Sequence, residues 1–150
     1  MKYRTTDELG HFNFEEACIA EIRTMGERFL MALDNVKILP ENSCNRDIRI
    51  MRTNGLELRI EGMKSLTVVE EGYQVYDADG NLLRKEEDRT VLAEEYRETF
   101  EELAGCMLYS IEKKDEEYIF SIDTEDHTFL IRVTGKEDIE EWDRFLNLEG

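Results

Sequence analysis

Residues 107–134 have the sequence MLYSIEKKDEEYIFSIDTEDHTFLIRVT, in which three segments alternate apolar with polar residues. Successive side chains of a β-strand point to opposite faces, so a period of two predicts three strands that share one apolar face. The short polar links between them predict a meander. The alternating sets are Met107/Tyr109/Ile111, Tyr118/Phe120/Ile122 and Phe129/Ile131/Val133.

Two further hairpins are predicted upstream of the meander. Residues 48–60 contain Asn54-Gly55, the dipeptide preferred by a type I′ turn, followed by the alternating residues Leu56, Leu58 and Ile60. Residues 77–81, DADGN, lie between the strand-like segments GYQVY and LLRK. Glycine and asparagine adopt the positive φ angles that a tight chain reversal requires, so this segment is also predicted to be a turn.

The N-terminal third fits two interpretations. Phe14, Cys18, Ile22 and Met25 have helical spacing, whereas a break at Gly26-Glu27 and the alternating apolar residues that follow it fit strands. We favour strands because β-branched and aromatic residues are frequent here. Asp34-Asn35 would then be a kink before the segment VKIL.

Two amphipathic helices are predicted, at about 93–104 and 137–147. In the first, apolar residues recur at helical spacing and Gly105 is placed to end the helix. In the second, Thr134 and Glu137 have the spacing of a capping box. Trp142 is then expected in the core. The apolar stripes are Leu92/Tyr96/Phe100/Leu103 and Ile139/Trp142/Phe145/Leu146.

These elements predict one α+β domain over residues 1–150. We expect a strand-rich, mostly antiparallel sandwich or open barrel with two amphipathic helices packed against it.

Charge limits the partners that this chain can have. It carries 19 Lys+Arg against 36 Asp+Glu, a formal net charge of −17, and residues 101–150 alone contain 5 basic and 15 acidic residues. This charge repels nucleic acid and anionic membrane surfaces over a Debye length of about 8 Å. The first residues, MKYRTTDELGHFNF, lack the basic and apolar regions of a secretory signal, so we expect a bacterial cytoplasmic protein.

The sequence offers little catalytic or metal-binding chemistry. GxSxG, P-loop, GxGxxG and HExxH motifs are absent, and only His11 and His127 could supply imidazole. In a calcium loop that places Gly80 sixth, Val75 would occupy the first ligand position, so a hairpin turn is the better interpretation. We expect no catalytic residue, cofactor or metal, and three free thiols, at Cys18, Cys44 and Cys106.

Charged clusters are interpreted as solvated or paired within the molecule. A carboxylate pair could act as general acid and base if one member were desolvated, but pairs arise by chance among 36 acidic residues. The basic residues of residues 46–59 are expected to pair with the acidic helices. The carboxylate pairs include Glu15/Glu16, Glu94/Glu95, Glu101/Glu102 and Glu140/Glu141, and the basic residues are Arg46, Arg49, Arg52 and Arg59.

Three functional hypotheses remain. The first is a non-catalytic acidic binding module that neutralises a basic protein, as an immunity protein or inhibitor would, because complementary charge speeds association. The second is a homo-oligomeric small-ligand-binding or sensory domain. The third is an enzyme whose site is assembled from distant residues. For the first, the expected interaction face consists of Glu94, Glu98, Glu101 and Glu102.

Overall fold

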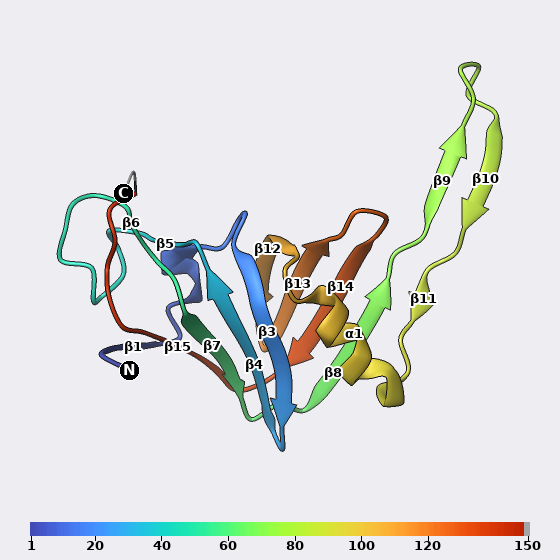
Figure 1. Ribbon diagram of the computed structural model, residues 1–150. Coiled ribbons are helices and arrows are strands. Elements are labelled where there is room, and N and C mark those ends of the chain that lie inside the picture. Colours follow the sequence, from blue (N-terminus) through green and yellow to red (C-terminus); the bar gives the residue numbers. More distant parts are fainter. Residues whose placement is uncertain (149–150) are drawn as a thin grey trace.

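A computed structural model describes residues 1–148, and most of its regular structure is antiparallel β-strand (Figure 1). Ten strands form the main sheet, in the spatial order β1 (Tyr3–Thr6), β15 (Glu137–Trp142), β7 (Leu56–Glu61), β4 (Arg28–Asp34), β3 (Cys18–Met25), β12 (Met107–Lys114), β13 (Glu117–Asp123), β14 (Thr128–Thr134), β8 (Ser65–Glu70) and β11 (Arg89–Thr90). β1 and β11 form its two open ends, so the sheet does not close into a barrel.

Two smaller sheets and one α-helix complete the fold over residues 1–148. The sheets are β2 (Phe12–Asn13), β5 (Val36–Ile38) and β6 (Met51–Thr53), and the hairpin of β9 (Tyr73–Tyr76) and β10 (Leu82–Glu86). Two 3-10 turns, at Leu9–His11 and Ala93–Glu95, and the helix α1 (Tyr96–Leu103) are the helical elements. The α+β, strand-rich and mostly antiparallel prediction is therefore confirmed, whereas the prediction of two helices is wrong.

The core forms where the alternating residues of neighbouring strands face α1. The main sheet curves so that β3 and β8 lie on either side of α1 (Figure 1). The Tyr96 hydroxyl donates a hydrogen bond to the Leu66 carbonyl of β8 at 3.1 Å, and the Phe100 ring packs against Phe29 of β4. The fully buried side chains include Phe29, Met31, Leu33, Leu56, Leu58, Ile60, Tyr118, Phe120, Ile122, Ile131 and Val133.

The first predicted helix is present and shorter than expected. Residues 93–95 form a 3-10 turn, and the α-helix ends at Leu103 with Ala104 as its C-cap. Gly105 follows with a φ of 91° and donates its N–H to the Ile19 carbonyl at 2.7 Å. The chain therefore leaves the helix at Ala104, whose backbone is extended, and the predicted C-cap at Gly105 lies one residue too late.

The second predicted helix, 137–147, is wrong, because Glu137–Trp142 is strand β15. This strand pairs with β1 on one side and β7 on the other, and a helix would leave β1 unpaired and one edge of β7 without its backbone hydrogen bonds. Gly135, before β15, packs so closely that a Cβ would lie 2.4 Å from Ile60 Cγ2. Trp142 is fully buried, as expected, but on a strand, where it contacts Tyr3, Phe12 and Phe145.

The predicted hairpin at 48–60 is also wrong, because β6 and β7 belong to different sheets. β4 and β5 pair with β7 and β6 in one register that continues from Leu33–Leu56 to Val36–Thr53. Asn54-Gly55 lies opposite Asp34-Asn35, so both strands bend together there as they pass from one sheet to the other. Asn35 N–H donates to Asn54 Oδ1 at 2.9 Å, and Gly55 N–H donates to Asp34 Oδ1 at 2.8 Å.

A positive φ at Gly55 explains the glycine at the bend where β7 and β6 pass from one sheet to the other. Gly55 has a φ of 71° and Asn35 a φ of 58°, whereas a type I′ turn would require a positive φ at Asn54 as well. The predicted kink at Asp34-Asn35 is confirmed, and the chain reverses instead in the loop of residues 39–50. The strands predicted for the N-terminal third are confirmed as β3 and β4, joined at Gly26.

The meander is confirmed as β12, β13 and β14, with one change of face in β12. The register shifts between Leu108 and Ser110 opposite Ile122 and Ser121. Leu108 is therefore buried, whereas Met107 and Tyr109 are 47% and 61% exposed. The prediction that these two residues lie in the core is wrong, because the shift places them on the surface.

Candidate functional site

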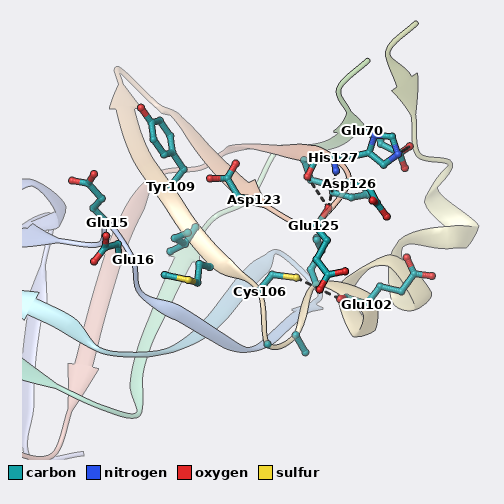
Figure 2. Close-up of a pocket in the computed structure, with 17 residues that line it drawn as sticks. Glu15, Glu16, Glu70, Glu102, Cys106, Tyr109, Asp123, Glu125, Asp126 and His127 are labelled. Carbon is teal, nitrogen blue, oxygen red and sulfur yellow. Dashed lines mark hydrogen bonds and ion pairs between the residues drawn. The ribbon is translucent and has the colours of Figure 1, made fainter. Parts of the chain in front are cut away.

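An open cleft of about 990 Å³ lies between the end of α1, the start of β12 and the turn joining β13 to β14 (Figure 2). Its apolar surface comes from Leu103, Met107, Leu108, Tyr109 and Phe129. Figure 2 shows Tyr109 on the side of Glu15 and Glu16, with Glu70 and His127 on the opposite side. We call this the acidic cleft because its remaining side chains are mostly carboxylates.

Seven carboxylates line the acidic cleft, and no lysine or arginine does so within residues 1–148. Of the seven, Glu70 is the one within 4.0 Å of a described cationic side chain, with Arg89 at 3.0 Å and His127 at 3.6 Å. The other six have no cationic side chain within 4.0 Å among the described residues, so acidic groups dominate the surface of the cleft. The seven are Glu15, Glu16, Glu70, Glu102, Asp123, Glu125 and Asp126.

The turn that presents Glu125 and Asp126 is held by its own hydrogen bonds. Thr124 N–H and Thr124 Oγ1 both donate to the His127 carbonyl, at 2.9 and 2.7 Å, and His127 N–H lies 3.0 Å from Thr124 Oγ1. The turn is thus closed by one backbone hydrogen bond and by two that involve the Thr124 hydroxyl. The two carboxylates are thus exposed on an ordered turn, which lowers the entropy that a binding partner must overcome.

The interaction face expected from the sequence shares one residue, Glu102, with the acidic cleft. All four of its glutamates are exposed, on the Ala93–Glu95 turn and α1. Glu102 lines the acidic cleft, whereas Glu101 lies on another side of the helix, 3.7 Å from Arg97. Glu94 and Glu98 are outside the cleft lining. The structure thus adds the carboxylates of the β13–β14 turn, which sequence reasoning did not select because acidic residues are frequent throughout the chain.

A second group of carboxyls is buried at the other end of the sheet. Asp138 and Glu140 lie on one face of β15, and both are fully buried. Asp138 Oδ1 accepts a hydrogen bond from the Tyr118 hydroxyl at 2.8 Å and is 3.2 Å from Lys113 Nζ. Glu140 Oε1 accepts from Thr5 Oγ1 at 2.7 Å. We call Asp138 and Glu140 the buried carboxyl pair.

The two members of the buried carboxyl pair differ in ionisation. Burial, followed by the hydrogen bond to Asp138 and its negative charge, raises the pKa of Glu140 to about 10. Burial also opposes ionisation of Asp138, but hydrogen bonds from Glu140 and Tyr118 and the Lys113 cation outweigh it and lower the pKa of Asp138. At neutral pH Glu140 therefore holds a proton and donates it to the Asp138 carboxylate.

This shared proton also accounts for two oxygens that otherwise lack a donor. Asp138 Oδ2 and Glu140 Oε2 are buried without a hydrogen-bond partner among the described N–H and O–H groups. A proton held between the carboxyls supplies one, as in other close carboxyl pairs. Asp7 and Lys113 separate the pair from a second cleft of about 590 Å³. Both carboxyls are fully buried, so a substrate would have no direct contact with them.

A sequence signal for the buried pair existed. Asp138, Glu140 and Trp142 recur at a period of two, as expected for one strand face. The prediction of a helix over 137–147 is incompatible with this period of two. The interpretation of the pair Glu140/Glu141 from the sequence is that both carboxylates are solvated. That interpretation is wrong for Glu140.

The arginines do not pair with the helix as expected. Arg59 lies 3.4 Å from Glu61 and also contacts Glu141, both on strands, and Arg49 is 3.1 Å from Asp47 in its own loop. The interpretation of helix pairing is wrong for these two residues.

The other predicted features are simpler. Residues 77–81 form the predicted hairpin turn, with Asp77 Oδ1 accepting from the N–H groups of Asp79 and Asn81. The three cysteines are free and half-buried, and burial, with a smaller effect of Cys18, raises the pKa of the Cys106 thiol.

Comparison with protein-family models, with curated proteins and with solved structures finds no match to this chain. In the part of the chain that the structure describes, no helix is long and apolar enough to cross a membrane. Within the same residues, no three His, Cys, Asp or Glu side chains are grouped so as to hold a metal ion. The features of the molecule that bear on function are therefore the carboxylates of the acidic cleft and the buried carboxyl pair.

Proposed function

We propose that this chain is a non-catalytic cytoplasmic binding module that neutralises a basic protein by accepting a cationic segment of it in the acidic cleft. The observation that carries the proposal is the set of seven carboxylates around one cleft, six of them without a close cation among the described residues. Opposite charge on the partner raises the association rate and excludes acidic competitors.

The apolar surface of the cleft supports a protein segment as the ligand. Met107 and Tyr109 are exposed beside the carboxylates, and tyrosine is frequent among the residues that contribute most to interfaces. A partner segment with apolar side chains between its lysines or arginines would use both kinds of surface.

The test uses a fluorescein-labelled nonapeptide of alternating arginine and leucine and the full chain. We expect the cleft variant Glu102→Gln/Glu125→Gln/Asp126→Asn to weaken binding about tenfold, since three unpaired carboxylates are neutralised. The matched control is Glu94→Gln/Glu98→Gln/Glu101→Gln, which changes the net charge equally at exposed residues outside the cleft lining. We expect the control to weaken binding by less than about threefold.

Fluorescence anisotropy of the labelled peptide at 50 mM and 500 mM salt gives its dissociation constant for each triple variant. Stopped-flow mixing of the same peptide gives its association rate constant, which should fall at high salt because the Debye length shrinks. Equal losses for the two triple variants would contradict the cleft as the site and would leave only a non-specific effect of net charge.

The hypothesis of an enzyme assembled from distant residues has a structural counterpart in the buried carboxyl pair, whose neighbours come from β1, β12, β13 and β15. The full burial of both carboxyls favours the binding module instead.

A further inference from the structure

Residues 71–88 form an arm that extends away from the rest of the molecule (Figure 1). Within it, β9 and β10 pair only with each other, as a two-stranded sheet. The tip is well formed, since Asp77 N–H donates to the Asn81 carbonyl at 2.9 Å and Gly80 has a φ of 85°. At the base, Gly72 N–H donates to Asp88 Oδ1 at 2.7 Å.

The arm exposes apolar side chains on both of its faces. Val75, Tyr76, Leu82 and Leu83 are 41%, 54%, 51% and 64% exposed. Tyr76 lies opposite Leu82 on one face, and Val75 lies opposite Arg84 on the other. An isolated two-stranded hairpin is marginally stable in water, so these side chains favour a further strand beside the arm.

The two edges of the arm differ in charge. β10 contains Arg84, Lys85 and Glu86, and charged residues protect an edge strand from pairing with another chain. β9 has the sequence YQVY and contains no charged residue, although the molecule has a net charge of −17. The β9 edge therefore lacks the charges that oppose pairing.

The backbone N–H and C=O groups of alternate residues of β9 point toward this open edge. Because Asp77 N–H bonds to the Asn81 carbonyl, Tyr76 and Leu82 form a non-hydrogen-bonded pair. The N–H and C=O groups of Tyr76, and by alternation those of Gln74, are directed away from β10. A strand placed against β9 would satisfy them.

We propose that β9 pairs antiparallel with β9 of a second copy, with the two-fold axis at Val75, to form a four-stranded sheet. Gln74 of one copy then lies opposite Tyr76 of the other, and within β9 itself no like charges face each other. The same edge is used by both copies, as a two-fold interface requires. The arms also hold the two acidic bodies apart, which limits their repulsion.

A second copy fits this edge better than a cationic partner does. A basic segment is attracted to carboxylates, and β9 has none, whereas an uncharged antiparallel strand matches itself. Each copy has a net charge of −17, so electrostatic repulsion makes the association of two copies weak at low salt and stronger at high salt, where the repulsion is screened. The acidic cleft has the opposite salt dependence, so the two proposals fail independently.

The test is sedimentation equilibrium of the full chain over about 10 to 500 µM at 50 mM and 500 mM salt. We expect a monomer–dimer equilibrium whose dissociation constant falls as salt rises. Val75→Glu should raise this constant about tenfold or more, because it places two carboxylates opposite each other at the axis. Within one arm the new glutamate lies opposite Arg84, so the hairpin itself is retained.

Two controls separate strand pairing from general apolar association. Leu83→Glu removes an exposed apolar residue of β10, on the other strand of the arm, and should leave the dimer intact. Mixing Val75→Glu with Val75→Lys should restore dimers as a mixed species. A monomer at every concentration and salt, equal losses for Val75→Glu and Leu83→Glu, or a dimer weakened by salt would each overturn the proposal.

Discussion

The acidic cleft and the buried carboxyl pair contain the same chemical group in opposite surroundings. In the cleft, Glu125 and Asp126 are exposed on a turn. On β15, Asp138 and Glu140 are fully buried, and burial together with the Asp138 charge raises the pKa of Glu140. The exposed carboxylates contribute little to folding and are open to a partner, whereas the buried pair is closed to partners and would be costly to break, because its neighbours would lose their hydrogen bonds inside the protein.

The largest expected effect comes from removing one member of the buried pair. Asp138→Ala should lower the free energy of unfolding by about 3 to 5 kcal/mol, because Lys113 and Tyr118 lose their acceptor and Glu140 loses its hydrogen-bond partner. Asp126→Ala in the cleft should change it by less than about 0.5 kcal/mol. Urea unfolding at pH 7 measures both, and similar small losses would contradict the structural role of the pair.

The second prediction concerns pH. Glu140 has a raised pKa in the folded state, so the stability that it contributes is fully present below the unfolded value, near 4.5, and is lost as pH rises toward about 10. Asp138 acts in the opposite direction, since its lowered pKa removes stability only as pH falls below its unfolded value, 3.8.

Glu140→Gln should therefore flatten the decline of stability between pH 5 and pH 9, a decline limited to about 1.4 kcal/mol per pH unit for one group. Its amide still accepts from Thr5 and can donate to Asp138. Urea midpoints at half-unit pH steps provide the measurement, with Glu125→Gln as the exposed control. An unchanged slope would show that Glu140 is ionised in the folded state.

A smaller effect is expected from two tyrosines, one buried and one exposed. Tyr118→Phe removes the donor to Asp138 and should cost about 1 to 2 kcal/mol, as for hydrogen bonds to charged groups. Tyr109→Phe at the cleft should be neutral for stability, because Tyr109 is 61% exposed. Thermal melts of the two variants compare them directly. Equal melting temperatures would mean that Asp138 is satisfied by its other hydrogen-bond donors without the Tyr118 hydroxyl.

The smallest effect concerns repulsion within the cleft. Neutralising Glu102, Glu125 and Asp126 should raise stability by about 0.5 kcal/mol at 50 mM salt and by almost nothing at 500 mM, since exposed charges are screened. Unfolding curves at the two salt concentrations check this. A gain that persists at high salt would indicate that these carboxylates are desolvated, like the buried pair.

Several elements follow from local sequence alone. The alternation of Phe120 and Ile122, and of Ile131 and Val133, determines two strands of the meander, because only a period of two buries these side chains together. The turn at residues 77–81 follows from the side chain of Asp77 and the positive φ of Gly80.

The candidate site followed from the sequence only in part. An acidic interaction surface was expected from net charge, and Glu102 belongs to the cleft that the structure describes. The turn carboxylates Glu125 and Asp126 could not be selected, because their proximity to α1 depends on the packing of β12 between β3 and β13. The shift at Leu108 that exposes Tyr109 depends on the same neighbours.

Tertiary structure decided the segments whose local signals conflict. Residues 137–147 fit both a helical stripe through Ile139 and Trp142 and a strand face through Asp138 and Glu140. Pairing with β1 and β7 selects the strand, since unpaired edges of those strands would cost more free energy than the helical preference of glutamate provides. Asn54-Gly55 determines a positive φ by itself, but whether that φ reverses the chain or bends it depends on Asp34-Asn35, about twenty residues earlier, which only the folded chain brings opposite it.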